Sequence, residues 1–480
     1  MKKVYITTTL AYVNADPHIG YALEAVRADA WARWQRVRGN EVFFNTGVDE
    51  HGLKILEQAR KSGKDPQSYC DEQTVKWRNL KKILNLSFNN FIRTTDERHI
   101  KAAQEFWKQT KANGYIYKKI YKAKYCVGCE LEKTDSELAY NKCPLHPNRD
   151  LEIIEEENYF FRFSAFQQKL LDLYKNNPNF VIPRKRFNEI KKFVAMGLAD
   201  FSISRLKTKM PWGIEVPDDS NHVIYVWFDA LVNYIFAIGW PASSDFYQWW
   251  PVIQVAGKDN LRQQSAIWQA MLMAVDLPAS KQIFINSFLT SNGQKMSKSL
   301  GNVISPNEMM AKFDIDGTRY LLLSIDSFGD DVDISWQGMI EKYNADLANG
   351  LGNLVSRVAN LLEKNLIQLS LKVDENNLSL YKKYNQNMEN FYFSQVLKNI
   401  WQIFKQADEV LSVAKPWEIK DKEKIKQILQ PIVRDILNAA NLLKPFMPDV
   451  SQKLIKQFSA KQIIKDQALF PRIYSSCTAH

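Results

Sequence analysis

The sequence contains no apolar run of the length that a membrane-spanning helix requires. Its first nine residues, Met1 to Thr9, are too polar for a secretory signal peptide. These two absences argue against a membrane protein and against a secreted one. We therefore expect a soluble, cytoplasmic protein that has no membrane partner.

Cysteine is scarce, with five in 480 residues, and three of the five lie between positions 126 and 143. An odd number with a cluster argues against the disulfide framework of small secreted proteins. The same arrangement favours a metal site in a reducing compartment.

The chain also lacks an acidic excess. Lys and Arg total 64 against 53 Asp and Glu, so the net charge is +11. The segment from Ser335 onward carries +6 of this charge, with 20 basic and 14 acidic residues. A modest basic excess suits a nucleic-acid partner, although many basic proteins bind none. Hydrophobic residues make up 45% of the chain, which is typical of a globular protein with a large core.

No internal repeat divides the chain, so its organisation is inferred from the residue pattern. β-Branched residues predict a buried strand over 4–10, and Pro17 is expected to be the first residue of a helix over about 18–37. A strand at 42–44 completes a βαβ unit. Such a unit implies a parallel sheet whose site lies at the carboxyl ends of the strands.

The α/β pattern is interrupted over 115–220 and then resumes. A strand at 252–256, a helix at 261–274 and a strand at 282–286 follow the interruption. We interpret the interruption as an insertion between two halves of one nucleotide-binding fold.

From Trp336 onward, apolar residues recur every three or four positions, as they do in a helical bundle. Long helices are expected over 391–411 and 425–443. The Lys- and Asn-rich stretch 382–389 is expected to be a loop between helices.

Two segments carry groups that a nucleotide needs. KMSKS at 295–299 follows the turn at Asn292 and Gly293, and it places two lysines three residues apart, so they can straddle a polyphosphate. Taken alone, this string is also typical of an exposed basic loop. Near the N-terminus, His18 and Gly20 stand where the first helix begins. The free N–H groups and the dipole of a helix start attract phosphate.

A His-Ile-Gly element after the first strand, together with a distant KMSKS, resembles the class I aminoacyl-tRNA synthetases. The spacing between them resembles the methionyl-tRNA synthetase family, along nearly the whole chain. The resemblance implies that methionine and ATP, bound with Mg²⁺, form methionyl-adenylate and pyrophosphate. It also implies transfer of methionine to the 3′ end of methionine tRNA, both initiator and elongator.

The resemblance assigns the nucleotide site by position. The implied catalytic residues are His18, Gly20, Tyr21, Lys295 and Lys298, and the implied ATP ligands are His18, Gly20, Gly257, Asp259, Gln264 and Lys298. This chemistry needs positioning and charge neutralisation rather than a protein nucleophile. Tyr21 and Gln264 both replace histidines that are usual in the family. Each can donate a hydrogen bond, but neither can carry the charge of imidazolium.

The resemblance also implies a methionine pocket made of Leu10, Tyr12, Asp49, Arg205, Trp227, Ala230 and Tyr234. A thioether is apolar and polarisable and favours aromatic edges, and a carboxylate is the natural partner of an α-ammonium group. Apart from the resemblance, the segment 225–228 is more typical of a core strand. No large editing insertion is evident, which argues against the isoleucine, valine and leucine enzymes.

The cysteine cluster has the spacing of a zinc site. Cys126 and Cys129 are separated by two residues, and so are Cys143 and His146. Thiolate and imidazole ligands in two such pairs make a closed tetrahedral site. Because four ligands leave no open position, we expect one structural Zn²⁺ per chain. Similar knuckles occur in the inserted domain of the resembled family.

The helical segment has residues suited to an unpaired RNA base. Asn353 and Arg357 lie four residues apart on one helix face, and Trp417 follows Pro416. The resemblance makes Asn353, Arg357 and Trp417 the anticodon readers. The alternative is that Trp417 packs in a turn of the core. No further oligonucleotide-binding domain is evident after the bundle, and we expect a monomer.

The expected fold class is a Rossmann-like α/β catalytic domain with a zinc-containing insertion, followed by an all-α anticodon-binding bundle. Its divisions are the first catalytic half (1–114), the insertion (115–220), the second catalytic half (221–290), the KMSKS loop with a connecting region (291–335) and the bundle (336–480).

Two other functions stay open at this point. A class I relative that activates cysteine is one, although such an enzyme is expected to hold zinc against its substrate rather than in an insertion. An RNA-binding zinc protein without catalysis is the other, because Tyr21 and Gln264 replace the usual histidines. Pyrophosphate exchange with each amino acid would separate all three functions.

Overall fold

A seven-stranded parallel sheet forms the centre of the computed structural model, which describes residues 1–133, 137–291, 293–296, 302–326, 329–373 and 378–474. The strand order is β2-β3-β1-β13-β14-β8, and β4 pairs with β3. The strands are β1 (Lys3–Thr8), β2 (Ala11–Tyr12), β3 (Glu41–Asp49), β4 (Asn90–Arg93), β8 (Val181–Ile182), β13 (Ile253–Gly257) and β14 (Gln282–Asn286).

Successive residues of β14 enter different cores on the two faces of the sheet. Phe284 packs into the core that holds α1 (Ile19–Val37), α3 (Pro66–Ile83) and α11 (Pro306–Leu323). Ile283 and Ile285 pack into the other core, which holds α4 (Glu97–Ala112) and α10 (Trp268–Ala274). This alternation follows from the two-residue period of a strand. Both faces of the parallel sheet are therefore covered, as the apolar strands require.

Two helices differ from the pattern that the sequence predicts. The prediction that Pro17 opens the first helix is wrong, because α1 begins at Ile19 with His18 as its N-cap. His18 supplies the side-chain acceptor that a proline cannot, so the helix begins two residues later than Pro17. The helix expected over 261–274 is π-helical over Gln263–Ile267 before α10 begins.

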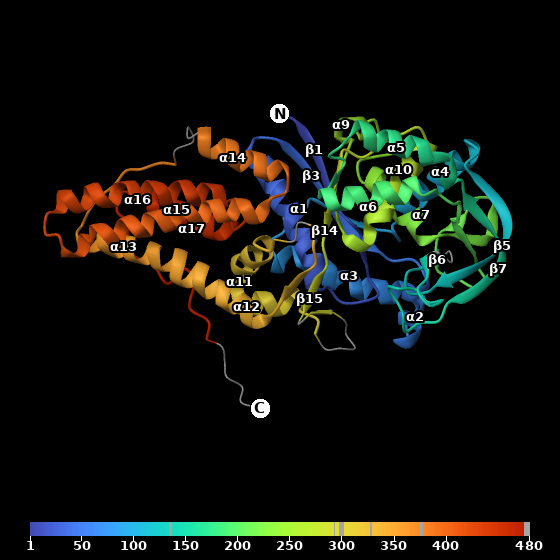
Figure 1. Cartoon of the computed structure of the whole chain (residues 1–480), viewed down its shortest axis with the longest axis horizontal. Coiled ribbons are helices and arrows are strands. Elements are labelled where there is room, and N and C mark those ends of the chain that lie inside the picture. The colour runs from blue at the N-terminus through green and yellow to red at the C-terminus, as the bar shows by residue number, and fades with distance from the viewer. Residues whose placement is uncertain (134–136, 292, 297–301, 327–328, 374–377, 475–480) are drawn as a thin grey trace, which may run out of the picture.

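The insertion holds a four-stranded antiparallel sheet in the order β6-β5-β7-β9, at the opposite end of the molecule from the bundle (Figure 1). Its strands are β5 (Ile116–Cys126), β6 (Leu131–Lys133), β7 (Glu152–Phe161) and β9 (Phe201–Ser202). A smaller sheet joins β10 (Ser204–Leu206), β12 (Asp219–Ile224) and β11 (Glu215–Val216). The segment 115–220 also supplies β8, which pairs with β14 at the edge of the central sheet.

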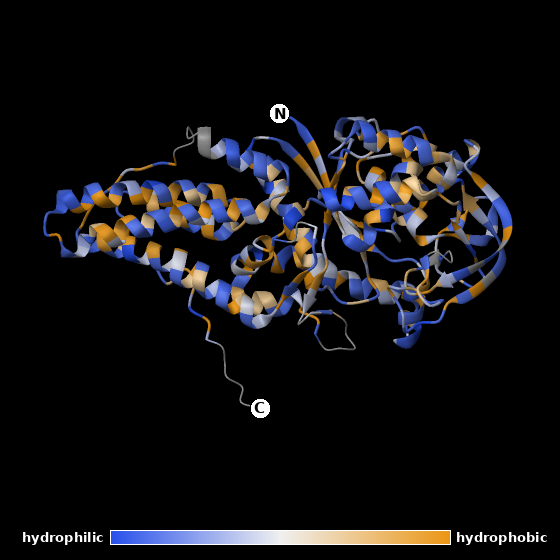
Figure 2. Ribbon diagram, in the orientation of Figure 1, coloured by the Kyte–Doolittle hydropathy of each residue, from blue (hydrophilic) through white to orange (hydrophobic). Residues whose placement is uncertain are grey.

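Helices make up the last third of the chain. They are α12 (Trp336–Lys342), a π-helical segment (Tyr343–Gly352), α13 (Asn353–Lys364), α14 (Leu378–Glu389), α15 (Phe393–Ala414), α16 (Lys422–Leu443) and α17 (Pro448–Phe458). Hydrophobic and hydrophilic residues alternate along these helices (Figure 2), as amphipathic packing requires. Within the described residues, no helix is both long enough and apolar enough to cross a membrane.

The expectation of a loop at 382–389 is wrong, because these residues belong to α14. Tyr384 and Met388 lie four residues apart and are buried in the same core as α1. Asn385 Oδ1 accepts a hydrogen bond of 2.9 Å from Trp34 Nε1. The polar composition of α14 therefore reflects its exposed face. The buried Tyr384 and Met388, the Trp34–Asn385 hydrogen bond and an ion pair between Arg38 and Glu389 attach it to the catalytic domain.

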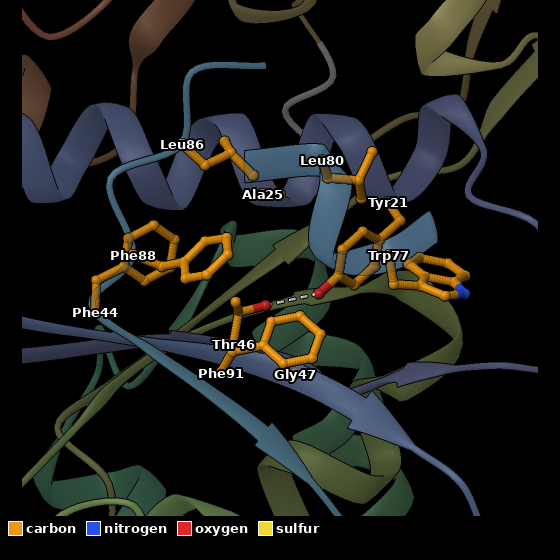
Figure 3. A pocket seen from close by; sticks show the side chains of 10 residues that line it. All are labelled: Tyr21, Ala25, Phe44, Thr46, Gly47, Trp77, Leu80, Leu86, Phe88 and Phe91. Atoms are coloured by element: carbon orange, nitrogen blue, oxygen red, sulfur yellow. Dashed lines mark hydrogen bonds between the residues drawn. The ribbon is translucent and has the colours of Figure 1, made fainter. Parts of the chain in front are cut away.

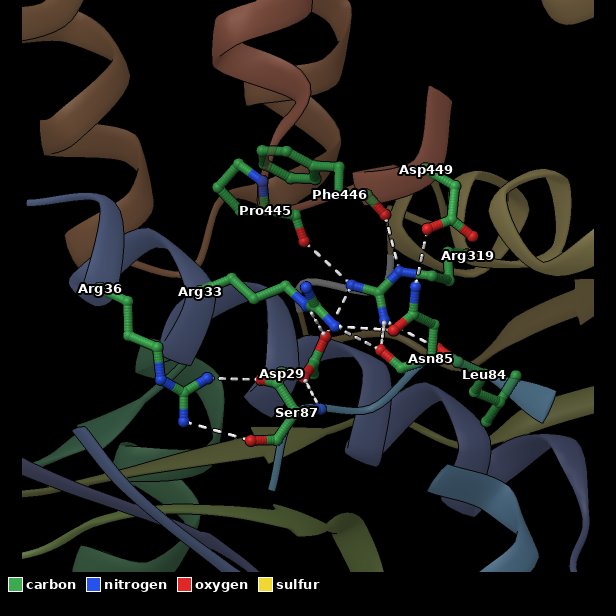
Figure 4. Close-up of polar contacts among 10 residues, drawn as sticks. All are labelled: Asp29, Arg33, Arg36, Leu84, Asn85, Ser87, Arg319, Pro445, Phe446 and Asp449. Carbon is green, nitrogen blue, oxygen red and sulfur yellow. Dashed lines mark hydrogen bonds and ion pairs between the residues drawn. The ribbon is translucent and has the colours of Figure 1, made fainter. Parts of the chain in front are cut away.

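Arg319 of α11 joins the helical bundle to the catalytic domain (Figure 4). Its guanidinium donates to the carbonyl oxygens of Phe446 at 2.8 Å, Pro445 at 2.9 Å and Leu84 at 2.9 Å, and it lies 2.8 Å from Asp29 Oδ2. Arg319 and Asp29 are fully buried. The five donors of one guanidinium thus connect α1, α11 and the turn before α17.

Candidate functional site

The start of α1 forms one wall of a site at the carboxyl ends of β1 and β13. His18 Nδ1 accepts hydrogen bonds from the backbone N–H groups of Gly20, at 3.1 Å, and Tyr21, at 3.4 Å. A neutral ring with an accepting Nδ1 carries its proton on Nε2. Desolvation lowers the pKa of His18, and the nearby Asp259 opposes this shift. His18 is therefore a neutral donor that faces Asp259 across the strand ends.

Gly20 lies close to the imidazole that caps the helix, because a Cβ there would lie 3.0 Å from His18 Nδ1 and would require the ring to shift. The N–H of the preceding residue, Ile19, donates to the carbonyl oxygen of Ile304 at 3.0 Å. Residue 304 follows the KMSKS stretch by a few positions. The helix start and the chain after KMSKS are therefore held together by a backbone hydrogen bond.

Gly257 and Asp259 lie at the end of β13, as the sequence predicts. A Cβ at Gly257 would lie 2.7 Å from Asp259 Oδ1, so a larger residue here would displace the Asp259 side chain. Glu24, which the sequence reasoning missed, lies beside them. Its Oε1 accepts from Thr9 N at 2.7 Å and from Thr9 Oγ1 at 2.6 Å, and its carboxyl is also hydrogen-bonded by the backbone of Gly257.

Burial raises the pKa of Glu24 to about 8, against the effect of the hydrogen bonds from Thr9 and Gly257. A signal for this residue exists in the sequence. Glu24 follows Gly20 by four positions and therefore shares its helix face, where an acid among buried apolar residues is unusual.

Tyr21 turns away from the nucleotide side and into the layer between α1 and the sheet. Its hydroxyl lies 2.9 Å from Thr46 Oγ1 and 3.2 Å from Thr8 Oγ1, and its ring meets Trp77 edge to face at a centroid distance of 5.0 Å. Aromatic and aliphatic side chains from α1, β3 and α3 line a cavity of about 10 Å³ beside it (Figure 3). The hydroxyl of Tyr21 thus connects β1 and β3 through its hydrogen bonds.

Gln264 belongs to a buried amide and hydroxyl chain. Its Nε2 donates to Tyr234 Oη at 2.8 Å, and its Oε1 accepts from Gln254 Nε2 at 2.7 Å. The carbonyl oxygen of Tyr234 accepts from Tyr5 Oη at 2.9 Å. Burial raises the pKa of the Tyr234 hydroxyl, which stays protonated. Gln264 therefore orients Tyr234, a residue of the predicted methionine pocket.

Asp49 ends β3 beside Tyr12, its partner residue in the β2–β3 pairing. Burial raises the pKa of Asp49, and the nearby carboxylates of Asp229 and Glu130 raise it further. The N–H of His51 lies 3.5 Å from Asp49 Oδ1. Several acids around one buried point favour the arrival of a cation, such as an ammonium group.

Asp229 lies between two imidazoles and is hydrogen-bonded to both. His51 Nδ1 lies 2.6 Å from Asp229 Oδ2, and His99 Nε2 lies 2.6 Å from Asp229 Oδ1. Burial opposes ionisation of Asp229, but the two histidines outweigh it and hold its pKa below the usual range. The sequence reasoning missed this triad, because its members come from the loop after β3, from α4 and from α7 (Val226–Ala230).

The triad fixes the helix that carries two predicted pocket residues, Trp227 and Ala230. The segment 225–228 is not a strand, because Val226 to Phe228 form the start of α7. Trp227 is half-buried and Ala230 is buried. Leu10 is half-buried between β1 and β2.

Arg205 is buried and held in place by the backbone and by aromatic rings. Its Nη1 donates to Ser204 O at 2.7 Å and to Ser202 Oγ at 2.8 Å. Its guanidinium carbon lies 5.0 Å from the ring centroids of both Tyr125 and Tyr225. The positive charge of Arg205 also reaches Glu130, whose pKa it lowers against the larger raising effect of burial.

Cys126, Cys129, Cys143 and His146 converge, with their ligand atoms all within 4.8 Å of one another. The Cys129 N–H donates to Cys126 O at 3.1 Å, and the His146 N–H donates to Cys143 O at 3.0 Å, so each pair closes a turn. Three sulfurs and one imidazole nitrogen are the donor set that tetrahedral zinc prefers. These residues fit a closed metal site.

KMSKS lies only partly within the described residues. Lys295 ends β16 (Gln294–Lys295), which pairs with β15 (Leu289–Ser291). β17 (Val332–Ile334) lies on the other side of β15. Lys298 lies outside the described residues.

The three predicted anticodon readers lie at neighbouring points of the bundle. Asn353 is exposed at the start of α13, and Trp417 is 49% exposed in the turn after α15. The guanidinium carbon of Arg357 lies 5.3 Å from the Trp417 ring centroid. Asp408 Oδ1 lies 2.7 Å from Arg357 Nη1. Trp417 is therefore a partly open ring with a cation on one face, rather than a core residue.

Comparison with known families gives two matches that together cover most of the chain. The family described as tRNA synthetases class I (M) matches residues 4–150 and 134–359. The anticodon-binding domain of tRNA ligase matches residues 378–477.

Among individual proteins, the chain is similar to the methionine–tRNA ligase of Thermotoga maritima, with 40% identity over 96% of this chain and 76% of that one. The methionine–tRNA ligase of Brucella suis shares 39% identity over 95% of this chain and 91% of its own. The structure of Mycobacterium tuberculosis methionyl-tRNA synthetase in complex with methionyl-adenylate superposes with a TM-score of 0.91, at 33% identity over 98% of this chain and 100% of that one.

Proposed function

The chain belongs to the methionine–tRNA ligases of the class I tRNA synthetase family, and we propose that it performs their reaction with the residues described above. It is a ligase that activates methionine with ATP and then charges tRNA with the activated methionine. Among the alternatives, a cysteine-activating enzyme finds no support in these relatives. One observation supports the residue assignment. The start of α1, the Gly257 turn and a buried acidic pocket all lie at the carboxyl ends of the parallel strands.

The nucleotide binds at the start of α1. The helix dipole and the N–H groups there attract its phosphates, and Mg²⁺ accompanies it. His18 Nε2–H serves as a neutral donor, and Gly20 and Gly257 give the nucleotide close access to the backbone. Lys295 and Lys298 supply positive charge from the KMSKS loop, and Asp259 accepts from the ribose.

Methionine binds next to the nucleotide. Its α-ammonium group pairs with Asp49, which ionises when the cation arrives because the ion pair offsets the cost of burial. The thioether packs against aromatic and aliphatic side chains with Arg205 at the border, a surface made of Leu10, Tyr12, Trp227, Ala230 and Tyr234. Tyr21 and Gln264 contribute by orienting their neighbours.

Activation requires only positioning and charge stabilisation. A carboxylate oxygen of methionine forms a bond to the α-phosphorus of ATP, and the bond between that phosphorus and the bridging oxygen breaks. Pyrophosphate leaves with the electron pair. Charge accumulates on the phosphoryl oxygens, where the lysines and helix N–H groups stabilise it.

Zn²⁺ is the metal that the Cys126, Cys129, Cys143 and His146 donor set fits, with one ion per chain. These four residues would hold the ion as a structural cross-link within the insertion. The enzyme then transfers methionine to initiator and elongator tRNA, and Asn353, Arg357 and Trp417 read the anticodon.

The molecule works as a monomer in the cytoplasm, where its tRNA substrates are charged. Its functional divisions follow the boundaries 1–114, 115–220, 221–290, 291–335 and 336–480.

ATP–pyrophosphate exchange tests the activation step directly. Methionine should support exchange and cysteine should not. Replacing Lys298 by Ala removes one charged donor from the transition state, which should lower kcat about 10²–10³-fold. An unchanged kcat in Lys298→Ala would remove the KMSKS loop from the mechanism, and exchange with cysteine alone would overturn the choice of substrate.

A further inference from the structure

Glu130 directly follows the predicted metal ligand Cys129, yet its side chain lies in the amino-acid pocket. Its Oε1 accepts hydrogen bonds from Tyr12 Oη at 2.7 Å and from the backbone N–H of Lys54 at 3.1 Å. Only 3% of Glu130 is exposed. One residue therefore connects the metal knuckle to Tyr12, a member of the methionine pocket.

The backbone of Glu130 is fixed as firmly as its carboxylate. Its φ of +52° lies in the left-handed region that glycine and asparagine usually occupy. The hydroxyl of Tyr225 donates to the carbonyl oxygen of Glu130. Tyr225 immediately precedes α7, the helix that carries Trp227 and Ala230. An unfavourable conformation that persists needs such support from its surroundings.

Gly52 leaves the space that this contact occupies. A Cβ at Gly52 would lie 2.6 Å from Tyr12 Oη and 3.1 Å from Glu130 Oε2. Gly52 also has a φ of +104°, and it caps α2 (Leu53–Lys61), whose second residue is Lys54. The start of α2 is thus shaped around the Tyr12–Glu130 hydrogen bond.

The charges around Glu130 agree with a role in the pocket. Lys54 Nζ lies 5.5 Å from the ring centroid of Tyr12, and Asp49 is close enough to Glu130 for the two charges to interact. Glu130 is therefore a second acid beside the one assigned to the α-ammonium group.

We propose that Glu130 is a positioning residue for methionine, and that the metal knuckle acts on the pocket through it. By fixing Cys129, the bound metal holds Glu130 against Tyr12, and Tyr12 keeps the place it needs beside the substrate. This inference rests on the proposed function. The knuckle then serves methionine binding as well as the folding of the insertion.

Two variants of Glu130 separate this role from a structural one. Glu130→Gln keeps an oxygen that can accept from Tyr12 and Lys54, whereas Glu130→Ala leaves a hydroxyl and an N–H without a partner. Losing such a partner should raise the methionine Kd and KM about 10-fold in Glu130→Ala. Glu130→Gln should stay within about 3-fold of the wild type, and the KM for ATP should be unchanged in both.

Calorimetric titration with methionine and pyrophosphate-exchange kinetics give these values. Glu155→Ala is a matched control, because Glu155 is an exposed acid of the same insertion that pairs with Lys122. A rise in the ATP KM equal to the rise for methionine would overturn the proposal. A lower melting temperature with an unchanged methionine Kd would do the same, since it assigns Glu130 to the fold alone.

Metal removal provides a second measurement. After chelation, checked by metal analysis, the methionine Kd of the wild type should rise to that of Glu130→Ala, and the Kd of Glu130→Ala should not rise further. Additive effects of chelation and mutation would contradict a shared route. Failure of the wild type to exchange pyrophosphate with methionine would reject the proposed function itself. Normal exchange by the wild type, with the methionine Kd and KM of Glu130→Ala unchanged, would reject only the role of Glu130.

Discussion

The amino-acid side of the cleft and the anticodon face of the bundle are built in opposite ways. Asp49, His51 and Asp229 are almost fully buried and bond to one another or to other protein groups. Trp417 and Asn353 are exposed on helices whose cores lie elsewhere. The first region is a closed network of buried groups, and the second is a set of exposed side chains on packed helices.

This difference has an energetic consequence. A buried charge needs every one of its partners, so the removal of one member should damage the fold and the pocket together. An exposed side chain on a stable helix can be removed with little effect on folding. The two regions should therefore respond differently to mutation, and four variants test that contrast, from the largest expected effect to the smallest.

Asp229→Ala should have the largest effect. It leaves the imidazoles of His51 and His99 buried without the carboxylate that they share. Leaving one buried hydrogen-bonding group without its partner costs about 1–3 kcal/mol, and two imidazoles are affected here. We expect a clear fall in the melting temperature and a rise of about 100-fold or more in the methionine KM. Asp330→Ala, at an exposed acid that pairs with Lys185, is the control. Wild-type stability in Asp229→Ala would show that the network is not what holds α7.

Trp417→Ala should affect only the second region. Base stacking on an aromatic ring contributes about 1–3 kcal/mol. Aminoacylation should therefore weaken about 5- to 150-fold, while pyrophosphate exchange and the melting temperature stay near the wild-type values. Tyr247→Ala, at another exposed aromatic residue, should change neither assay. If both activities of Trp417→Ala fell with the melting temperature, the ring would belong to the fold.

Glu24 brings a pH dependence to the nucleotide side of the closed region. Its pKa is about 8 in the folded protein, against an ordinary value of 4.5. Between these values the folded state binds more protons than the unfolded state, so stability decreases as the pH rises. The slope contributed by one proton is at most about 1.4 kcal/mol per pH unit. Glu24→Gln should reduce the dependence of the melting temperature on pH between pH 5 and 8. An unchanged dependence would contradict the raised pKa of Glu24.

Tyr21→Phe should have the smallest effect. It removes the hydroxyl that bridges Thr8 and Thr46 but keeps the ring against Trp77. One lost hydrogen bond of this kind costs about 0.5–1.5 kcal/mol. The melting temperature should fall by a few degrees, and kcat for pyrophosphate exchange should change by less than about 3-fold. A fall of 100-fold in kcat with normal melting would place the hydroxyl at the reacting phosphate instead.

The parts of the fold that the sequence predicted have strong local signals. β14 was bounded correctly, and α1 and α16 nearly so, because apolar residues recur at the period of each element. α14 was missed because, among its described side chains, Tyr384 and Met388 are the buried apolar ones, and they are set among polar residues. Such a helix is specified by docking on α1, which no local window contains.

The same distinction applies to the site. The metal knuckle was found from spacing alone, because each ligand pair lies within one turn. The contacts of Asp229 with His51 and His99, and of Glu130 with Tyr12, join residues more than 100 positions apart. No sequence pattern marks these pairs, although every member is of a type that carries chemistry. Lys298 was assigned by its motif and stays a prediction.

Calorimetric titration of the protein with methionine, in the absence of ATP and tRNA, tests most directly whether the amino-acid side is assembled before catalysis. The closed network predicts that one methionine binds per chain, that Asp229→Ala weakens this binding about 100-fold or more, and that Trp417→Ala leaves it unchanged. Binding of methionine only when ATP or tRNA is present would contradict the account, since the pocket would then be formed by its ligands rather than by the protein.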